Sequence, residues 1–96
     1  MSSAPDLTIA DSPEENRYVV RHAGEAIGFA AYRQAPGRVV FTHTEVDEDI
    51  EGQGVGSALV RAALDDVRAK GLGVTPECTF VAAFIREHTG YQDLVR

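Results

Sequence analysis

Two side chains in this sequence, Cys78 and His43, are suited to act as a nucleophile and a general base. Cys78 follows Pro76 and directly precedes an apolar stretch with helical spacing. A thiol at a helix N-terminus has a lowered pKa and therefore more of the reactive thiolate, which attacks thioesters readily. The unperturbed pKa of histidine, about 6.5, would let His43 take up a proton near neutral pH.

Both residues also have an ordinary structural interpretation. A lone cysteine is often a small apolar filler of a core. In a regular strand, His43 would share one face with Val39 and Phe41, which is the arrangement of a core histidine. The residues alone leave both interpretations open.

A second feature is the segment "EGQGVGSALV", residues 51–60, which places Gly52, Gly54 and Gly56 directly before a predicted helix. The first-turn N–H groups of a helix have no partner within it, and the helix dipole makes that end positive. Such a turn can bind an anion, and glycine lets the anion approach the backbone. The segment lacks the third glycine of the dinucleotide fingerprint and the lysine of the Walker A loop. A flexible turn without a ligand is the alternative.

These residues need elements to position them, and apolar spacing predicts the elements. The predicted strands are residues 7–9, 17–23, 25–33, 38–46 and 72–76. The predicted helices are residues 55–70, with an apolar residue at every fourth position from Val55 to Val67, and residues 79–88. Antiparallel strands followed by helix, strand and helix indicate an α+β fold with one βαβ crossover.

Composition excludes several classes of protein. A chain of 96 residues is one domain. Its net charge of −6 argues against a nucleic-acid binder, although one local positive site is compatible with it. The single cysteine precludes an intrachain disulfide and indicates a cytoplasmic protein. No apolar run approaches the roughly 20 residues that span a bilayer, and no His, Cys or Asp spacing indicates a metal site. Residues 1–16 are expected to be a flexible segment, apart from a short strand, and residues 17–96 the domain.

The pattern strand, [QR]-x-x-G-x-[GA], long helix is the acyl-CoA signature of the GNAT acetyltransferases. Residues 51–60 resemble it, with Gly54 and Gly56 at the glycine positions and Glu51 where Gln or Arg is usual. Residues 17–95 as a whole resemble the small YjdJ-type N-acetyltransferase domains. The markers are "HTEV", "EGQGVGSALV", Pro-x-Cys, "FVAAFIREH" and "Y-x-D-L-V".

This resemblance implies a truncated GNAT fold, with a mixed, mostly antiparallel sheet that opens beside the glycine turn. It implies acetyl-CoA as co-substrate, with pantetheine on the main chain near Glu45 and Val46. It also implies that His43 and Cys78 lie close together near the thioester. The pyrophosphate would contact the N–H groups of Gln53, Gly54, Val55, Gly56 and Ser57.

The function implied is an acetyl-CoA-dependent N-acetyltransferase whose amine acceptor is unidentified. The helices that usually wall the acceptor site have no counterpart before residue 55. An open site would suit a protein or peptide amine or a polyamine, unless a partner or second copy completes it. The acidic run from Glu45 to Glu51 would attract a cationic amine, or it is simply a solvated loop. A non-catalytic acyl-CoA sensor or adaptor is the alternative function.

Overall fold

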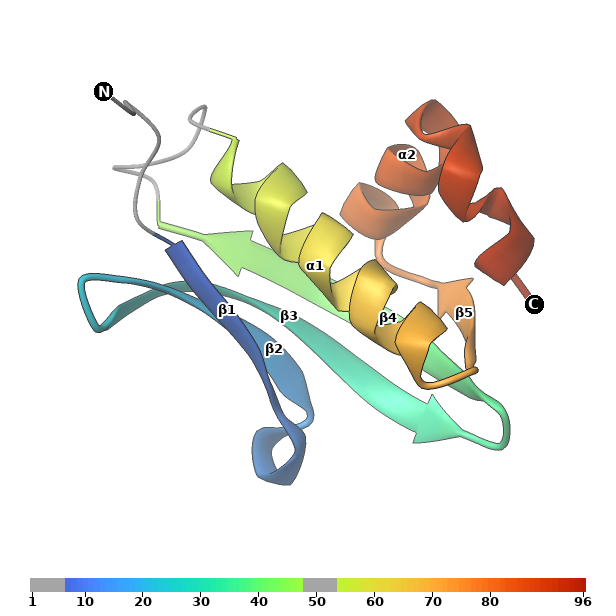
Figure 1. Ribbon diagram of the computed structural model, residues 1–96, viewed down its shortest axis with the longest axis horizontal. Coiled ribbons are helices and arrows are strands. Elements are labelled where there is room, and N and C mark those ends of the chain that lie inside the picture. The colour runs from blue at the N-terminus through green and yellow to red at the C-terminus, as the bar shows by residue number, and fades with distance from the viewer. Residues whose placement is uncertain (1–6, 48–53) are drawn as a thin grey trace.

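The computed structural model describes residues 7–47 and 54–96, which form a five-stranded sheet with two α-helices (Figure 1). The strands lie in the sheet in their order along the chain, and only β4 and β5 are parallel. The strands are β1 (Leu7–Ser12), β2 (Arg17–His22), β3 (Glu25–Ala35), β4 (Arg38–Val46) and β5 (Gly73–Pro76). The predicted α+β class and the βαβ crossover are confirmed.

Both helices lie on one face of this sheet (Figure 1). Helix α1 (Val55–Ala69) connects β4 to β5, and α2 (Thr79–Glu87) follows β5 and packs beside α1. Each helix ends one residue before its predicted end. The buried stripe of α1 is Val55, Leu59, Val60, Ala63, Leu64 and Val67. Burying a Leu or Val side chain stabilises the fold by about 1.5–3 kcal/mol, so this stripe fixes α1 on the sheet.

The first strand extends beyond its prediction. Residues 10–12, expected to be flexible, continue β1 and pair with β2, and Pro13–Glu15 form the short 3-10 helix η1. Ile9 packs against the core opposite Val20, which gives the strand an apolar side. The expectation of a flexible segment is therefore wrong for residues 10–12, which join the sheet, and for residues 13–15, which form η1.

A polar network ties β1 to the rest of the fold. Tyr32 donates a hydrogen bond of 2.7 Å to Asp11, and Tyr18 donates one of 2.6 Å to Asp66. Lys70 links the two carboxylates, at 3.1 Å from Asp11 and 2.7 Å from Asp66. The hydrogen bond from Lys70, and then that from Tyr18, lower the pKa of Asp66. The network joins three strands to the last turn of α1.

A β-bulge interrupts β4 at Thr42. Ala31 pairs with His43 and Tyr32 pairs with Phe41, so Thr42 has no partner on β3. The extra residue turns the chain, and His43 no longer shares a face with Phe41. The prediction that Val39, Phe41 and His43 share one face is therefore wrong for His43.

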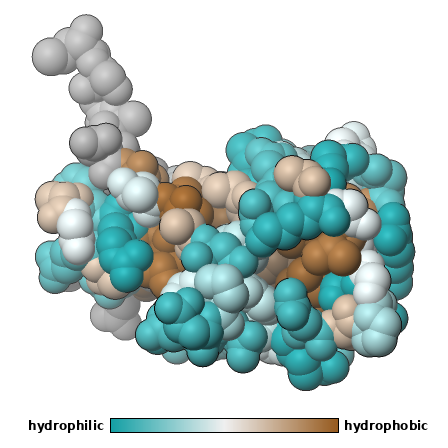
Figure 2. Space-filling model, turned by 60° about the horizontal axis from the view of Figure 1, so that its bottom comes forward, coloured by the Kyte–Doolittle hydropathy of each residue, from teal (hydrophilic) through white to brown (hydrophobic). Residues whose placement is uncertain are grey.

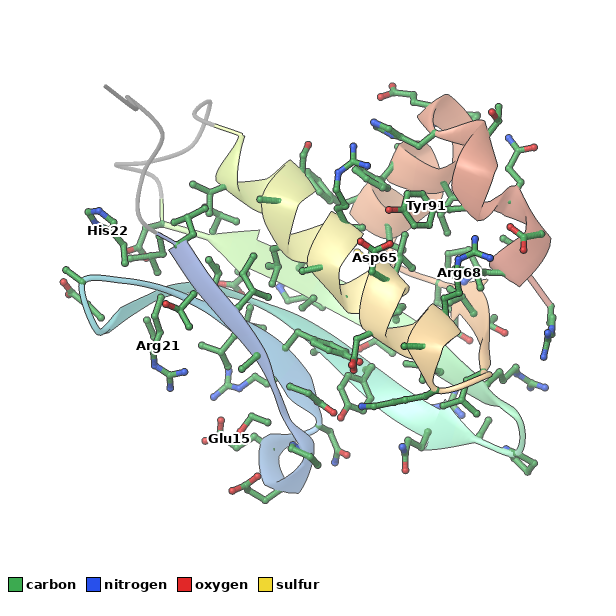
Figure 3. All side chains as sticks on the ribbon, viewed as in Figure 1. Glu15, Arg21, His22, Asp65, Arg68 and Tyr91 are labelled. Atoms are coloured by element: carbon green, nitrogen blue, oxygen red, sulfur yellow. The ribbon has the colours of Figure 1, made fainter. Side chains whose placement is uncertain are left out.

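The chain after α2 packs against α1. Residues Thr89–Leu94 form the 3-10 helix η3, where the sequence predicted no element. Arg68 binds Asp93 through two hydrogen bonds of 2.9 Å, and Tyr91 donates one of 2.7 Å to Asp65 (Figure 3). These contacts hold η3 and α2 beside α1.

Candidate functional site

The sheet forks between β4 and β5. The two strands pair over only four positions, from Arg38 opposite Gly73 to Phe41 opposite Pro76. The Cys78 N–H then donates a hydrogen bond of 2.8 Å to the Phe41 carbonyl, and the chain turns into α2. Strand β4 continues to Val46 and pairs only with β3 there. One edge of residues 42–46 therefore borders an opening.

The register of β3 shows which main-chain groups face this opening. The Tyr32 N–H donates a hydrogen bond to the Asn16 carbonyl. The even-numbered residues of β3 therefore direct their main-chain N–H and carbonyl groups toward β2. On β4, Thr44 lies opposite Ala30 and Val46 lies opposite Gly28. The main-chain N–H and carbonyl groups of Thr44 and Val46 therefore point away from β3. The bond from the Asp47 N–H to Ile27 fits the same alternation. Thr44 and Val46 direct their N–H and carbonyl groups into the opening, and Glu45 directs its own toward β3.

The glycine turn lies at the other side of the opening. Gly54 has a φ of 79°, in the left-handed region that glycine adopts without strain, and its carbonyl accepts the first helical hydrogen bond, from Ala58. The N–H groups of Val55, Gly56 and Ser57 then have no acceptor within α1. Among residues 7–47 and 54–96, no acidic side chain stands in this first turn and no side chain caps it. The positive end of α1 is thus available to an anion.

A cavity of about 460 Å³ joins these two features. Its lining residues are Thr44, Val46, Gly54, Val55, Gly56, Ser57 and Phe80. Phe80 is 43% exposed and lies over Gly56, where a Cβ would come within 2.8 Å of the ring. Gly56 therefore has a packing role, because it lets α2 approach α1. Thr44 and Phe80 were not predicted as site residues, because only the fold brings them to the glycine turn.

Cys78 lies at the inner end of the fork. It is the N-cap residue of α2, is 7% exposed, and belongs to the core cluster. Its Sγ is 3.3 Å from the Thr44 hydroxyl oxygen. Thr44 also lines the cavity, so Cys78 is one side chain removed from it.

His43 lies on the other face of β4. Neighbouring residues of a strand point to opposite faces, and Thr44 faces Cys78. The His43 side chain is 58% exposed, and its Nε2 lies 2.8 Å from the Glu45 carboxylate. Its ring also lies 6.1 Å from that of Phe29. The structure does not bring His43 and Cys78 together, and the bulge at Thr42 is the reason.

Of the other predicted residues, Val46, Gly54, Val55, Gly56 and Ser57 are brought together around the cavity. Gln53 and the acidic residues 48–51 lie outside the described residues. Among residues 7–47 and 54–96, no three His, Cys, Asp or Glu side chains are grouped as metal ligands would be. No helix in this part of the chain is long and apolar enough to cross a membrane.

Comparisons with known proteins agree with this geometry. A family model described as "GCN5-related N-acetyl-transferase" matches residues 17–94. The solution structure of a GCN5-like protein from Staphylococcus aureus is similar, with a TM-score of 0.72 and 26% identity over 95% of this chain and 89% of that one. No curated protein sequence matches.

Two longer enzymes share the fold. The ribosomal-protein-S18-alanine N-acetyltransferase of Escherichia coli has a TM-score of 0.64 and 18% identity, over 74% of this chain and 49% of that one. Ard1 of Thermoplasma volcanium has a TM-score of 0.57 and 29% identity, over 66% of this chain and 44% of that one. This chain therefore matches less than half of each longer enzyme.

Proposed function

The chain belongs to the GCN5-related N-acetyltransferase family, and we propose that it transfers an acetyl group from acetyl-CoA to an amine. One observation carries the proposal: a single cavity is bordered both by the free edge of β4 and by the positive end of α1. An extended amide chain that ends in a diphosphate needs these two surfaces together. We also place the protein in the cytoplasm, since its one cysteine fits a reducing compartment.

In this proposal, the pyrophosphate accepts hydrogen bonds from the N–H groups of Val55, Gly56 and Ser57, with Gln53 as a further donor. The amides of pantetheine pair with Thr44 and Val46, as an added strand would. This register replaces the expected pair of Glu45 and Val46, because Glu45 bonds toward β3. The thioester then lies toward the inner end of the fork, near Cys78.

The two expected catalytic side chains would flank the thioester from opposite faces of β4. On the exposed face, His43 accepts the proton of the attacking amine, and Glu45 orients its ring. The amine nitrogen bonds to the acetyl carbon, and the bond from that carbon to the CoA sulfur breaks. The CoA thiolate takes the proton from His43 and leaves as the thiol. This direct route needs no contact between His43 and Cys78.

A second route would use Cys78 as the first acceptor. Its sulfur attacks the acetyl carbon, CoA leaves with the thiol proton, and the amine then displaces Cys78 from the acetyl group. The Thr44 hydroxyl would orient the sulfur. Intact-mass measurement after incubation with acetyl-CoA distinguishes the routes, because only this one adds an acetyl group that Cys78→Ala abolishes.

One observation favours a non-catalytic binder as the second candidate. Within the described residues, no helix covers the sheet face on which an acceptor would approach His43. A sensor would bind acetyl-CoA and release no CoA with any amine. Release of CoA that depends on both an added amine and His43 would exclude it.

The diphosphate position is tested by Ser57→Glu, with Ser57→Gln as the matched control. A carboxylate in the first turn of α1 repels the diphosphate, and we expect CoA affinity to fall about tenfold in calorimetric titration. The same carboxylate stabilises a helix N-terminus, so the variant should fold at least as well as the control. Equal affinity of the two variants would contradict the proposed binding mode.

A further inference from the structure

A second cavity lies on the sheet face opposite the helices. Its volume is about 380 Å³, and side chains of β2, β3 and β4 line it. Figure 3 shows Glu15 and Arg21 below the sheet, whereas Asp65, Arg68 and Tyr91 lie among the helices. Figure 2, in which the bottom of Figure 1 comes forward, shows exposed apolar side chains between hydrophilic ones. This cavity is thus an amphipathic hollow on the other face of the sheet from the proposed CoA site, and Val46 borders both.

The middle of the hollow is apolar. Val19 on β2 pairs with Phe29 on β3, and Phe29 pairs with Glu45 on β4. Val19 is only 5% exposed, although no helix covers it in the described part of the chain. The Arg17 guanidinium lies 4.7 Å from the centre of the Phe29 ring and shields it. These contacts form a floor that an aliphatic chain can cover.

The two sides of the hollow carry opposite charge. Arg17 and Arg21 lie two residues either side of Val19, so both project from the same face of β2. Glu45 and Asp47 line the β4 side. The β2 and β4 main chains are separated by two strand spacings, about 10 Å. A ligand across the hollow would therefore meet two guanidinium groups at one end, with the Glu15 carboxylate beside Arg17, and two carboxylates at the other.

The cationic side has capacity for an anion. Besides its contact with the Phe29 ring, Arg17 has one weak ionic contact, 3.4 Å from its Nε to the Glu15 carboxylate. Within residues 7–47 and 54–96, Arg21 forms no salt bridge. On the acidic side, Glu45 already contacts His43 at 2.8 Å, and this pair lies at the edge of β4 that borders the fork.

We propose that the hollow binds the acceptor, and that the acceptor is an amine with a carboxylate at its other end. The ammonium group lies beside Glu45 and Asp47, within reach of His43, and the carboxylate binds Arg17 and Arg21. The aliphatic chain lies over the apolar floor between these two ends. This inference rests on the proposed function and narrows its acceptor class: a polyamine would place a second ammonium group against two guanidinium groups.

The test uses a matched pair of probes, 5-aminovalerate and cadaverine, which are aliphatic primary amines that end in a carboxylate and in a second ammonium group. Each is titrated into ¹⁵N-labelled protein, with and without acetyl-CoA. We expect 5-aminovalerate to shift amide resonances of β2, β3 and β4 around the hollow, and to bind at least about tenfold more tightly than cadaverine. Arg21→Glu should reverse this preference. Arg38→Glu makes the same charge change at the far end of β4 and should leave the preference unchanged.

Three results would overturn the inference. They are no resonance shift with either probe, equal affinities of the protein for 5-aminovalerate and cadaverine, or the same preference between the two probes in the Arg21→Glu and Arg38→Glu variants. Failure of acetyl-CoA to bind would instead refute the proposed function. The two failures are distinguishable, because amine titration without acetyl-CoA reports on the hollow alone.

Discussion

Replacement of Val46 by proline tests whether ligand binding depends on the main chain of β4. Proline removes the N–H that Val46 directs into the fork. It removes no hydrogen bond between β3 and β4, because Val46 and Gly28 form a pair that is not hydrogen-bonded. Since one hydrogen bond contributes about 0.5–1.5 kcal/mol, we expect CoA to bind roughly two- to twelvefold more weakly to the variant.

The comparison is with Val46→Ala, which removes the same apolar side chain and keeps the N–H. Calorimetric titration with CoA gives both dissociation constants, and no acetyl transfer takes place during the measurement. Urea denaturation shows whether both variants keep the same fold.

Glu45→Pro completes the set. Its N–H is directed toward β3, so this proline leaves a carbonyl of the neighbouring strand without its donor, at a cost of about 1–3 kcal/mol of stability. Equal CoA affinities for Val46→Pro and Val46→Ala, together with an undiminished stability for Glu45→Pro, would refute the register deduced for the fork.

Three further predictions concern stability, and urea denaturation measures each of them. Tyr18→Phe removes a 2.6 Å hydrogen bond to a carboxylate and should cost about 1.5–3 kcal/mol, whereas Tyr91→Phe, at an exposed bond, should cost less. Gly54→Ala should cost about 1 kcal/mol through its φ of 79°, whereas Gly90→Ala should be nearly neutral; equal effects would contradict the backbone argument. Because the pKa of Asp66 is lowered in the folded protein, its ionised carboxylate stabilises the fold fully at pH values above about 3.9, the pKa of an aspartate in an unfolded chain. This contribution is lost as the pH falls through the pKa of Asp66 in the folded state. Asp66→Asn should reduce the loss of stability at low pH, and the same dependence of stability on pH in this variant and in the wild type would contradict the role given to Asp66.

Much of the architecture follows from apolar spacing. The bounds of β4 agree with the prediction at both ends, and those of α1 at its start, because β-branched runs and a four-residue apolar period have few alternative structures. Edge elements were less predictable. Residues 10–12 carry little apolar signal of their own, and β1 extends through them because β2 supplies hydrogen-bond partners. The helix η3 depends similarly on Arg68, a residue distant in sequence.

The candidate site was predictable at its glycine turn and not at its side chains. A bulge leaves no mark in the sequence when the extra residue, here Thr42, is itself β-branched. The sequence therefore predicts a regular strand in which His43 faces the core. The contacts of Cys78 with Thr44 and of Phe80 with Gly56 join separate elements, so no local pattern contains them.

The order of the strands has a consequence for how the protein folds. Because β1 to β4 are neighbours both in sequence and in the sheet, their hairpins can form early through contacts between residues that are close in sequence. Strand β5 must wait for α1 and then gains only four pairs with β4. That junction has fewer pairs than any other two neighbouring strands of the sheet. We therefore expect transient opening of the native state to begin there, and a molecule that spans the two strands to slow it.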